Sequence, residues 1–108
     1  MAALPYLQLY VAEYLADTMH LTAEEHGAYL LIIFNYWQSG KPLADSNKLL
    51  SSVCSTTVER WLEIRSTVEE FFEVKNGLWT HHRIEEDIAR ASKKRKRGFK
   101  NTRQRPSA

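Results

Sequence analysis

The chain has 108 residues, of which 44% are hydrophobic and 26% are charged, which is enough for one small domain with a hydrophobic core. Its three Trp, five Tyr and four Phe argue against a disordered chain. No run approaches the ~18 apolar residues of a membrane span, and the first residues do not have the pattern of a signal peptide. A single cysteine excludes an internal disulfide framework and a cysteine-rich zinc site. We therefore expect a cytoplasmic protein without a membrane partner.

The charges are divided unevenly along the chain. All thirteen acidic residues lie between Glu13 and Asp87, and residues 1–92 as a whole contain seven Lys and Arg. Residues 93–108 contain the other eight Lys and Arg and no acidic residue. The sequence therefore predicts an acidic folded body followed by a basic, flexible tail over residues 92–108.

The N-terminal third predicts one extended segment and one central helix. Residues 5–16 mix β-forming aromatic residues with a helix-compatible end, which indicates a short extended segment and then a turn. We expect residues 1–20 to be an extension packed on the core. Thr22 and Glu25 have the spacing of a capping box, so a helix should begin there and end at Gly40. Gly27 inside this helix suggests close packing against another backbone.

The helix over 22–40 carries two apolar stripes, which is typical of a buried helix. The stripes are formed by Leu30, Ile33, Phe34 and Trp37, and by Tyr29, Ile32 and Tyr36.

Two shorter helices should follow, joined by a tight turn. Asp45 can cap the first helix, and Thr56 with Glu59 has the spacing of a second capping box. The helix–turn–helix spacing across residues 51–56 suits a helix-turn-helix motif.

The C-terminal third predicts a hairpin and a last helix. Asn76-Gly77 between two β-prone runs predicts a two-residue turn that pairs Val74 with Trp79 and Phe72 with His81. Residues 83 to about 96 predict a helix with a thin apolar stripe at Ile84, Ile88 and Ala91.

This order of elements defines the predicted fold class. We expect a mainly α single domain with a small β-hairpin, similar to a winged helix-turn-helix over residues 21–91, with residues 41–43 as a short third strand. A three-helix bundle with an appended hairpin is the alternative.

Several motifs also resemble a known family. Leu21-Thr22-Ala23-Glu24-Glu25-His26-Gly27-Ala28-Tyr29, with Pro5-Tyr6, Tyr36-Trp37, Pro42-Leu43, Phe71-Phe72 and Asn76-Gly77-Leu78-Trp79, is similar to the YdaU-like domain-of-unknown-function family of phages and prophages. The resemblance covers roughly residues 5–90. It implies a bacterial host and an association with phage replication, with a presumed role in replication initiation or helicase loading. No reaction is established for that family, and many relatives have a further C-terminal region.

The basic tail is the candidate nucleic-acid-binding site. Lys and Arg neutralise phosphates and release counterions, and an aromatic ring can stack on an unpaired base. The candidate residues are Lys93, Lys94, Arg95, Lys96, Arg97, Phe99, Lys100, Arg103 and Arg105. A solubilising tail, or one that folds back on the acidic body, is the alternative.

The second helix of the helix-turn-helix has a poor composition for reading DNA. Arg60 and Arg65 are outnumbered by acidic residues between positions 56 and 70, and both can pair with glutamates of the same helix. We therefore expect the body to contact protein, with Leu78, Glu59 and Glu63 as candidate outward residues.

The histidines and the cysteine do not form the patterns typical of a metal site or of a catalytic nucleophile. His81 and His82 are adjacent on a predicted strand and so point to opposite faces, and His20 and His26 have no cysteine partner nearby. Cys54 should be partly exposed, without a basic cluster to favour its thiolate. We expect no metal, no cofactor and no enzymatic activity.

The function that the sequence predicts is a phage or prophage replication-associated adaptor. Its body would bind a replication protein such as a helicase or helicase loader, and its tail would bind DNA without sequence preference. The alternatives are a dimeric winged-helix transcriptional regulator that binds a duplex operator, and an interaction module with an inert tail. A homodimer is also possible, since an extended edge at residues 7–11 can pair with a second chain.

Overall fold

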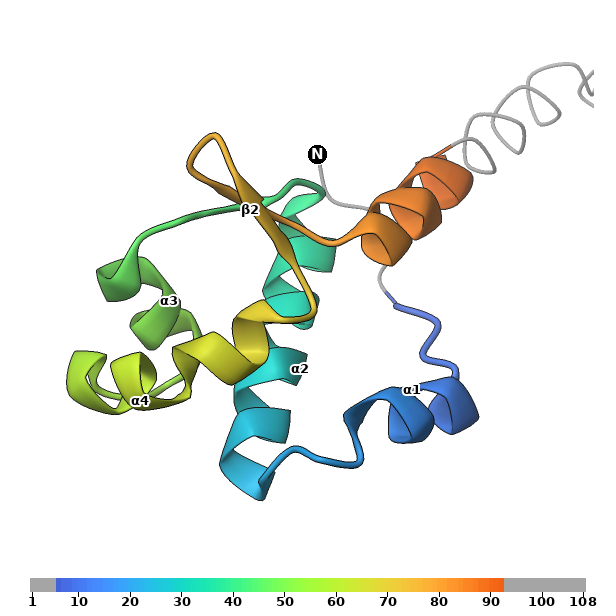
Figure 1. Ribbon diagram of the computed structural model, residues 1–108. Coiled ribbons are helices and arrows are strands. Elements are labelled where there is room, and N and C mark those ends of the chain that lie inside the picture. The colour runs from blue at the N-terminus through green and yellow to red at the C-terminus, as the bar shows by residue number, and fades with distance from the viewer. Residues whose placement is uncertain (1–5, 93–108) are drawn as a thin grey trace, which may run out of the picture.

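A long helix, α2 (Ala23–Ser39), lies at the centre of the computed structural model, which describes residues 6–92 (Figure 1). The predicted capping box is confirmed: Thr22 Oγ1 accepts from the Glu25 backbone N–H at 3.2 Å, and Glu25 Oε1 accepts from the Thr22 N–H at 2.8 Å. Gly40 ends the helix with a φ of 75°. Of the two predicted stripes, the one containing Tyr29 is fully buried, whereas Phe34 in the other is 47% exposed.

Helices α3 (Asn47–Val53) and α4 (Val58–Glu69) pack on α2 and on each other (Figure 1). The predicted cap at Asp45 is wrong: Ser46 caps α3 by accepting from the Leu49 N–H at 3.2 Å. The Asp45 carboxylate instead accepts from the Trp79 indole at 3.0 Å. The side chain that the spacing assigned to the cap is therefore used in a contact 34 residues away.

The second predicted capping box is displaced by one residue. Thr57, rather than Thr56, caps α4, by accepting from the Arg60 N–H at 3.1 Å. Ser55 has a φ of 56°, and the N–H of Thr56 reaches back to the carbonyl of Ser51 at 3.0 Å. This is the Schellman arrangement that ends α3, so Thr56 belongs to the end of one helix and the next residue starts the other.

A three-stranded antiparallel sheet of order β1-β3-β2 covers one end of the helices. It consists of β1 (Leu43–Ala44), β2 (Glu73–Lys75) and β3 (Leu78–Thr80). The predicted turn is confirmed, because Asn76 and Gly77 have φ values of 55° and 74° and Val74 pairs with Trp79. The third strand also forms, slightly later than the expected residues 41–43.

Residues 5–16 do not remain extended to a turn as expected. Helix α1 (Val11–Thr18) begins inside this segment and lies on the opposite side of α2 from α3 and α4 (Figure 1). Its exposed side mixes the apolar Val11 and Leu15, which are 62% and 55% exposed, with the charged Glu13 and Asp17, so burial along the helix does not follow hydrophobicity. Tyr14 holds it to the core, with its hydroxyl 2.7 Å from His26 Nδ1 and its ring stacked on Tyr29.

The last described element is a helix over residues 82–92, which confirms the predicted helix as far as residue 92. Ile84 and Ala91 are buried and Ile88 is partly buried, as the apolar stripe predicted. The remainder of that predicted helix, to Lys96, lies outside the described residues. None of the helices within residues 6–92 is long and apolar enough to cross a membrane.

Two glycines give a matched prediction about the backbone. A methyl group on Gly27 would meet no atom of another segment within 4 Å, so the expected close packing against a second backbone is wrong. Gly27→Ala should raise the free energy of unfolding by about 0.5–1 kcal/mol through helix propensity. Gly77→Ala should lower it by about 1 kcal/mol, because the φ of 74° is strained for any side chain. Urea denaturation measures both, and a stabilised Gly77→Ala variant would contradict the turn geometry.

Candidate functional site

The candidate nucleic-acid-binding residues lie in a part of the chain that the structure does not describe. These are Lys93, Lys94, Arg95, Lys96, Arg97, Phe99, Lys100, Arg103 and Arg105. Within residues 6–92, the surface that the sequence predicts to contact a protein is the outer face of α4, together with the neighbouring α3 and the β2–β3 turn. We call this the α4 face.

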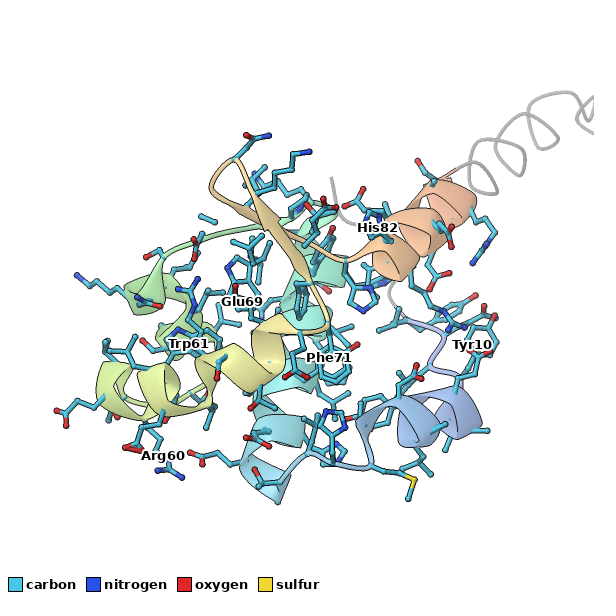
Figure 2. The ribbon with its side chains drawn as sticks, in the orientation of Figure 1. Tyr10, Arg60, Trp61, Glu69, Phe71 and His82 are labelled. Carbon is cyan, nitrogen blue, oxygen red and sulfur yellow. The ribbon has the colours of Figure 1, made fainter. Side chains whose placement is uncertain are left out.

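Arg60, the first cation of α4, is held by two carboxylates. Its Nε and Nη2 donate to Glu24 of α2 at 2.7 Å each, and its Nη1 donates to Glu63. Figure 2 shows Arg60 below α4, on the side that faces the first turn of α2. The hydrogen bond with Arg60 lowers the pKa of Glu24, and the same bond raises the pKa of Arg60. The pairing with Glu63 was predicted, whereas the fork onto Glu24 was not.

Arg65, the second cation of α4, holds the fold together. It pairs with Asp45 at 2.9 Å and with Glu69 at 3.0 Å, and its guanidinium lies 5.3 Å from the Trp79 ring centroid. It also donates to Asn47 Oδ1 at 2.7 Å, the atom that accepts from the Trp61 indole at 2.9 Å. Arg65 therefore links α4 to the start of α3 and to the sheet, and only 23% of its side chain is exposed.

The outer side of α4 combines exposed acidic residues with exposed apolar ones. Glu59 and Glu63 are exposed, and Leu62 and Val58, one turn apart, are 54% and 42% exposed. Leu78, a candidate outward residue, is 41% exposed on β3. Glu59 and Glu63 were the other two candidate outward residues, and Glu63 forms an ion pair with Arg60. A face of this composition repels phosphate and can bury apolar area against a protein.

The four histidines are distributed over the fold instead of gathering at one point. His20 lies 3.7 Å from Glu70, His82 lies 3.0 Å from Glu73, and His26 contacts Tyr14. His81 lies 2.9 Å from the Tyr29 hydroxyl. No group of three or more metal-ligating side chains occurs among residues 6–92.

Cys54 is buried, contrary to the expected partial exposure. It lies at the end of α3 and its thiol donates to the carbonyl of Ala28 in α2 at 3.6 Å. Burial raises the pKa of the Cys54 thiol to about 11, which keeps it protonated at neutral pH. Cys54 is buried because α3 packs on α2. The spacing of residues along the chain does not predict this contact between two helices.

His81 caps the C-terminal helix and links it to α2. Its Nδ1 accepts from the Ile84 N–H at 3.3 Å, so the neutral ring carries its proton on Nε2 and donates it to Tyr29. Burial lowers the pKa of His81, and His82 and Arg83 add to this, while Asp87 opposes it. The sequence had assigned His81 only to a pair with Phe72 in the hairpin.

A neutral His81 makes stability depend on pH. Its pKa is lower in the folded than in the unfolded chain, where it is near 6.5, so its contribution to stability is present above about pH 6.5 and is lost as the pH falls below that value. The native chain should therefore lose more stability between pH 7 and pH 5 than a His81→Asn variant, whose amide oxygen can still cap the helix. Urea denaturation across this range measures the difference, and parallel pH profiles would contradict it.

The chain forms a small, mainly helical domain with a three-stranded antiparallel sheet, and comparison with known proteins places it in a family. The chain belongs to the family described as Protein of unknown function (DUF1376), whose model matches residues 5–89. It is 55% identical over 94 residues to the Uncharacterized protein YdaU of Escherichia coli (strain K12). The match covers 87% of this chain and 32% of that relative, so the chain spans about a third of the relative's length. No solved structure matches the chain.

Proposed function

We propose that this chain is a non-enzymatic adaptor of phage or prophage replication. In this proposal a winged-helix-like body binds a protein partner, such as a helicase or a helicase loader, through the α4 face. The basic residues of positions 93–108 bind DNA without sequence preference.

The order of the elements supports the winged-helix part of the proposal. The sequence α2–β1–α3–α4–β2–β3, with β1 beside β3 in the sheet, is the order of a winged helix-turn-helix, with β2 and β3 as the wing. In such a module α4 occupies the position of the recognition helix.

The neutralisation of Arg60 and Arg65 is the observation that carries the proposed role of the body. A recognition helix that binds DNA needs cations available to phosphates or base edges. Both cations of α4 are instead engaged by carboxylates, from α2 and the β1–α3 connection as well as from α4 itself. The exposed Leu62 and Val58 beside Glu59 then favour a protein partner.

A triple variant tests whether the body contacts DNA. Lys48→Gln, Arg60→Gln and Lys75→Gln remove a cation from α3, from α4 and from the β2–β3 hairpin while residues 93–108 stay intact. We expect the slope of log K against log salt on a random duplex to stay unchanged, because these residues do not bind phosphate. Fluorescence anisotropy measures the slope. If the magnitude of the slope decreased by about three, the three residues would contact three phosphates, which would contradict the proposal.

The alternative is a dimeric transcriptional regulator, which the winged-helix order also favours. Such a protein binds one duplex site far more tightly than random DNA, and the preference resides in the body. Selection of bound sequences from a random duplex pool separates the two functions. An enriched motif that disappears in the triple variant establishes the regulator, and an unenriched pool supports the adaptor.

A further inference from the structure

A cavity of about 300 Å³ lies between residues 7–17, α2 and the C-terminal helix. Much of its lining comes from α1 and the C-terminal helix, which lie on the other side of α2 from α4 (Figure 1). Its volume is at the lower limit of small-molecule pockets, so it suits a side chain or a compact ligand.

Aromatic rings form one wall of the cavity. Tyr14 stacks on Tyr29 with a centroid distance of 6.0 Å and an interplanar angle of 8°, and Tyr29 stacks on Phe71 at 4.6 Å. Leu7, Ile33 and Ile84 add aliphatic surface to the lining. Such a lining can enclose an apolar stem, and the faces of the aromatic rings attract cations.

The charged residues of the lining are mainly acidic. It contains the carboxylates of Glu13, Asp17 and Asp87 and one guanidinium, that of Arg83. His81 also lines the cavity, and its buried ring favours the neutral form. This balance disfavours phosphates and other anions and favours a cation.

Arg83 already shows how the cavity holds a cation. Its guanidinium donates to Glu13 and lies 5.0 Å from the centroid of the Tyr10 ring, which Figure 2 shows between α1 and the C-terminal helix. A carboxylate and an aromatic face thus bind one guanidinium at this place. Glu13 is occupied by that contact, and Asp87 accepts from Arg90.

Asp17 is the carboxylate that remains for a ligand. It is exposed and has no hydrogen-bonding or ion-pair partner among residues 6–92. Burial raises the pKa of Tyr29 to about 12, with contributions from Tyr14 and from Asp17, so the charge of Asp17 acts on the hydroxyl of the aromatic wall. An unpaired carboxylate thus stands beside an aromatic, largely apolar cavity.

We propose that this cavity binds an alkylammonium or alkylguanidinium group on an apolar stem, the chemistry of a lysine or arginine side chain. The stem lies against Tyr14, Tyr29 and Phe71, and the cation pairs with Asp17. The group can come from the basic residues 93–108 of this chain or from a separate molecule, and the experiment distinguishes the two sources.

Titration of the full chain with n-butylammonium, followed by amide chemical shifts, tests the ligand class. n-Butanol and butyrate serve as the neutral and anionic probes of similar size. We expect saturable shifts at residues 9–17 and 83–87 with n-butylammonium, and at least fivefold weaker binding of both other probes. Equal binding of n-butanol, or shifts located elsewhere, would overturn the proposal.

Two matched variants test the role of Asp17. Asp17→Asn should weaken n-butylammonium binding by about fivefold, the effect of losing one partly exposed ion pair. Glu86→Gln removes the same charge from an exposed position on the C-terminal helix outside the lining, and should leave the affinity unchanged. Equal effects of the two variants would mean that only the overall charge matters and would overturn the site.

A third variant identifies the source of the cation. It replaces all eight Lys and Arg of residues 93–108 with Gln. If the chain's own segment is the ligand, the cavity amides shift in this variant without any probe, and n-butylammonium binds more tightly than to the native chain. If a separate molecule is the ligand, the cavity amides and the affinity of the probe stay as in the native chain. The site itself fails if the variant no longer binds the probe.

Discussion

Replacing Trp79 with alanine is expected to lower the free energy of unfolding by about 3–5 kcal/mol, the range for truncating a large buried aromatic side chain. Trp79 is 0% exposed and lies where the sheet meets the helices. Its ring centroid is 5.2 Å from that of Phe72 and 5.7 Å from that of Trp61, and its indole N–H donates to Asp45. Truncation opens a cavity and leaves the Asp45 carboxylate with one donor fewer.

Urea denaturation followed by far-UV circular dichroism measures this loss. Leu62→Ala is the matched control, since Leu62 is 54% exposed and its truncation should change stability by about 0.5 kcal/mol or less. Trp79→Phe keeps a ring in place and loses the hydrogen bond to Asp45, so we expect a smaller loss of about 1–2 kcal/mol. That variant supplies the measurement if the alanine variant does not fold. A loss below about 1 kcal/mol for Trp79→Ala would contradict the central position of this side chain.

Signals carried by two to four adjacent residues predicted the fold well. The box of Thr22 and Glu25 starts α2, and Asn76-Gly77 turns the hairpin in the predicted register. Both depend on backbone geometry over a few residues, so no distant contact is needed to interpret them.

Features that depend on contacts between distant segments could not be predicted in this way. Aspartate is a residue type that favours helix caps, yet the carboxylate of Asp45 accepts from the Trp79 indole, and Ser46 caps α3 instead. Helix α1 is stabilised by Tyr14 on α2, while its exposed side mixes apolar and charged residues, so the burial of its residues does not follow their hydrophobicity. In each case tertiary packing outweighs the local preference.

The candidate surfaces follow the same rule. The pairs of Arg60 with Glu63 and of Arg65 with Glu69 follow from spacings of three and four residues on one helix. Glu24 lies 36 residues before Arg60, and only the packing of α4 on α2 brings them together. The cavity likewise combines residues from four separate segments, and no motif in the sequence indicates it.

Neutralising residues 93–108 is expected to have the largest effect on DNA binding. If about six of the eight Lys and Arg contact phosphates, log K for duplex DNA falls against log salt with a slope near −5, which is about a thousandfold loss between 50 and 200 mM salt. Replacing all eight with Gln should remove this slope and reduce binding at low salt to the detection limit. Anisotropy titrations at four salt concentrations measure both quantities.

The triple variant Lys48→Gln, Arg60→Gln and Lys75→Gln is the control for this prediction, because it removes cations from the body while the eight of residues 93–108 remain. Since both arginines of α4 are held by carboxylates, the two sets of substitutions should differ strongly in their effect on affinity. Phe99→Ala refines the comparison: loss of stacking should weaken binding to single-stranded DNA by about 1–3 kcal/mol and leave duplex binding unchanged. A steep salt dependence that survives the eight substitutions would place the phosphate contacts on the body and would reverse the proposed division of roles.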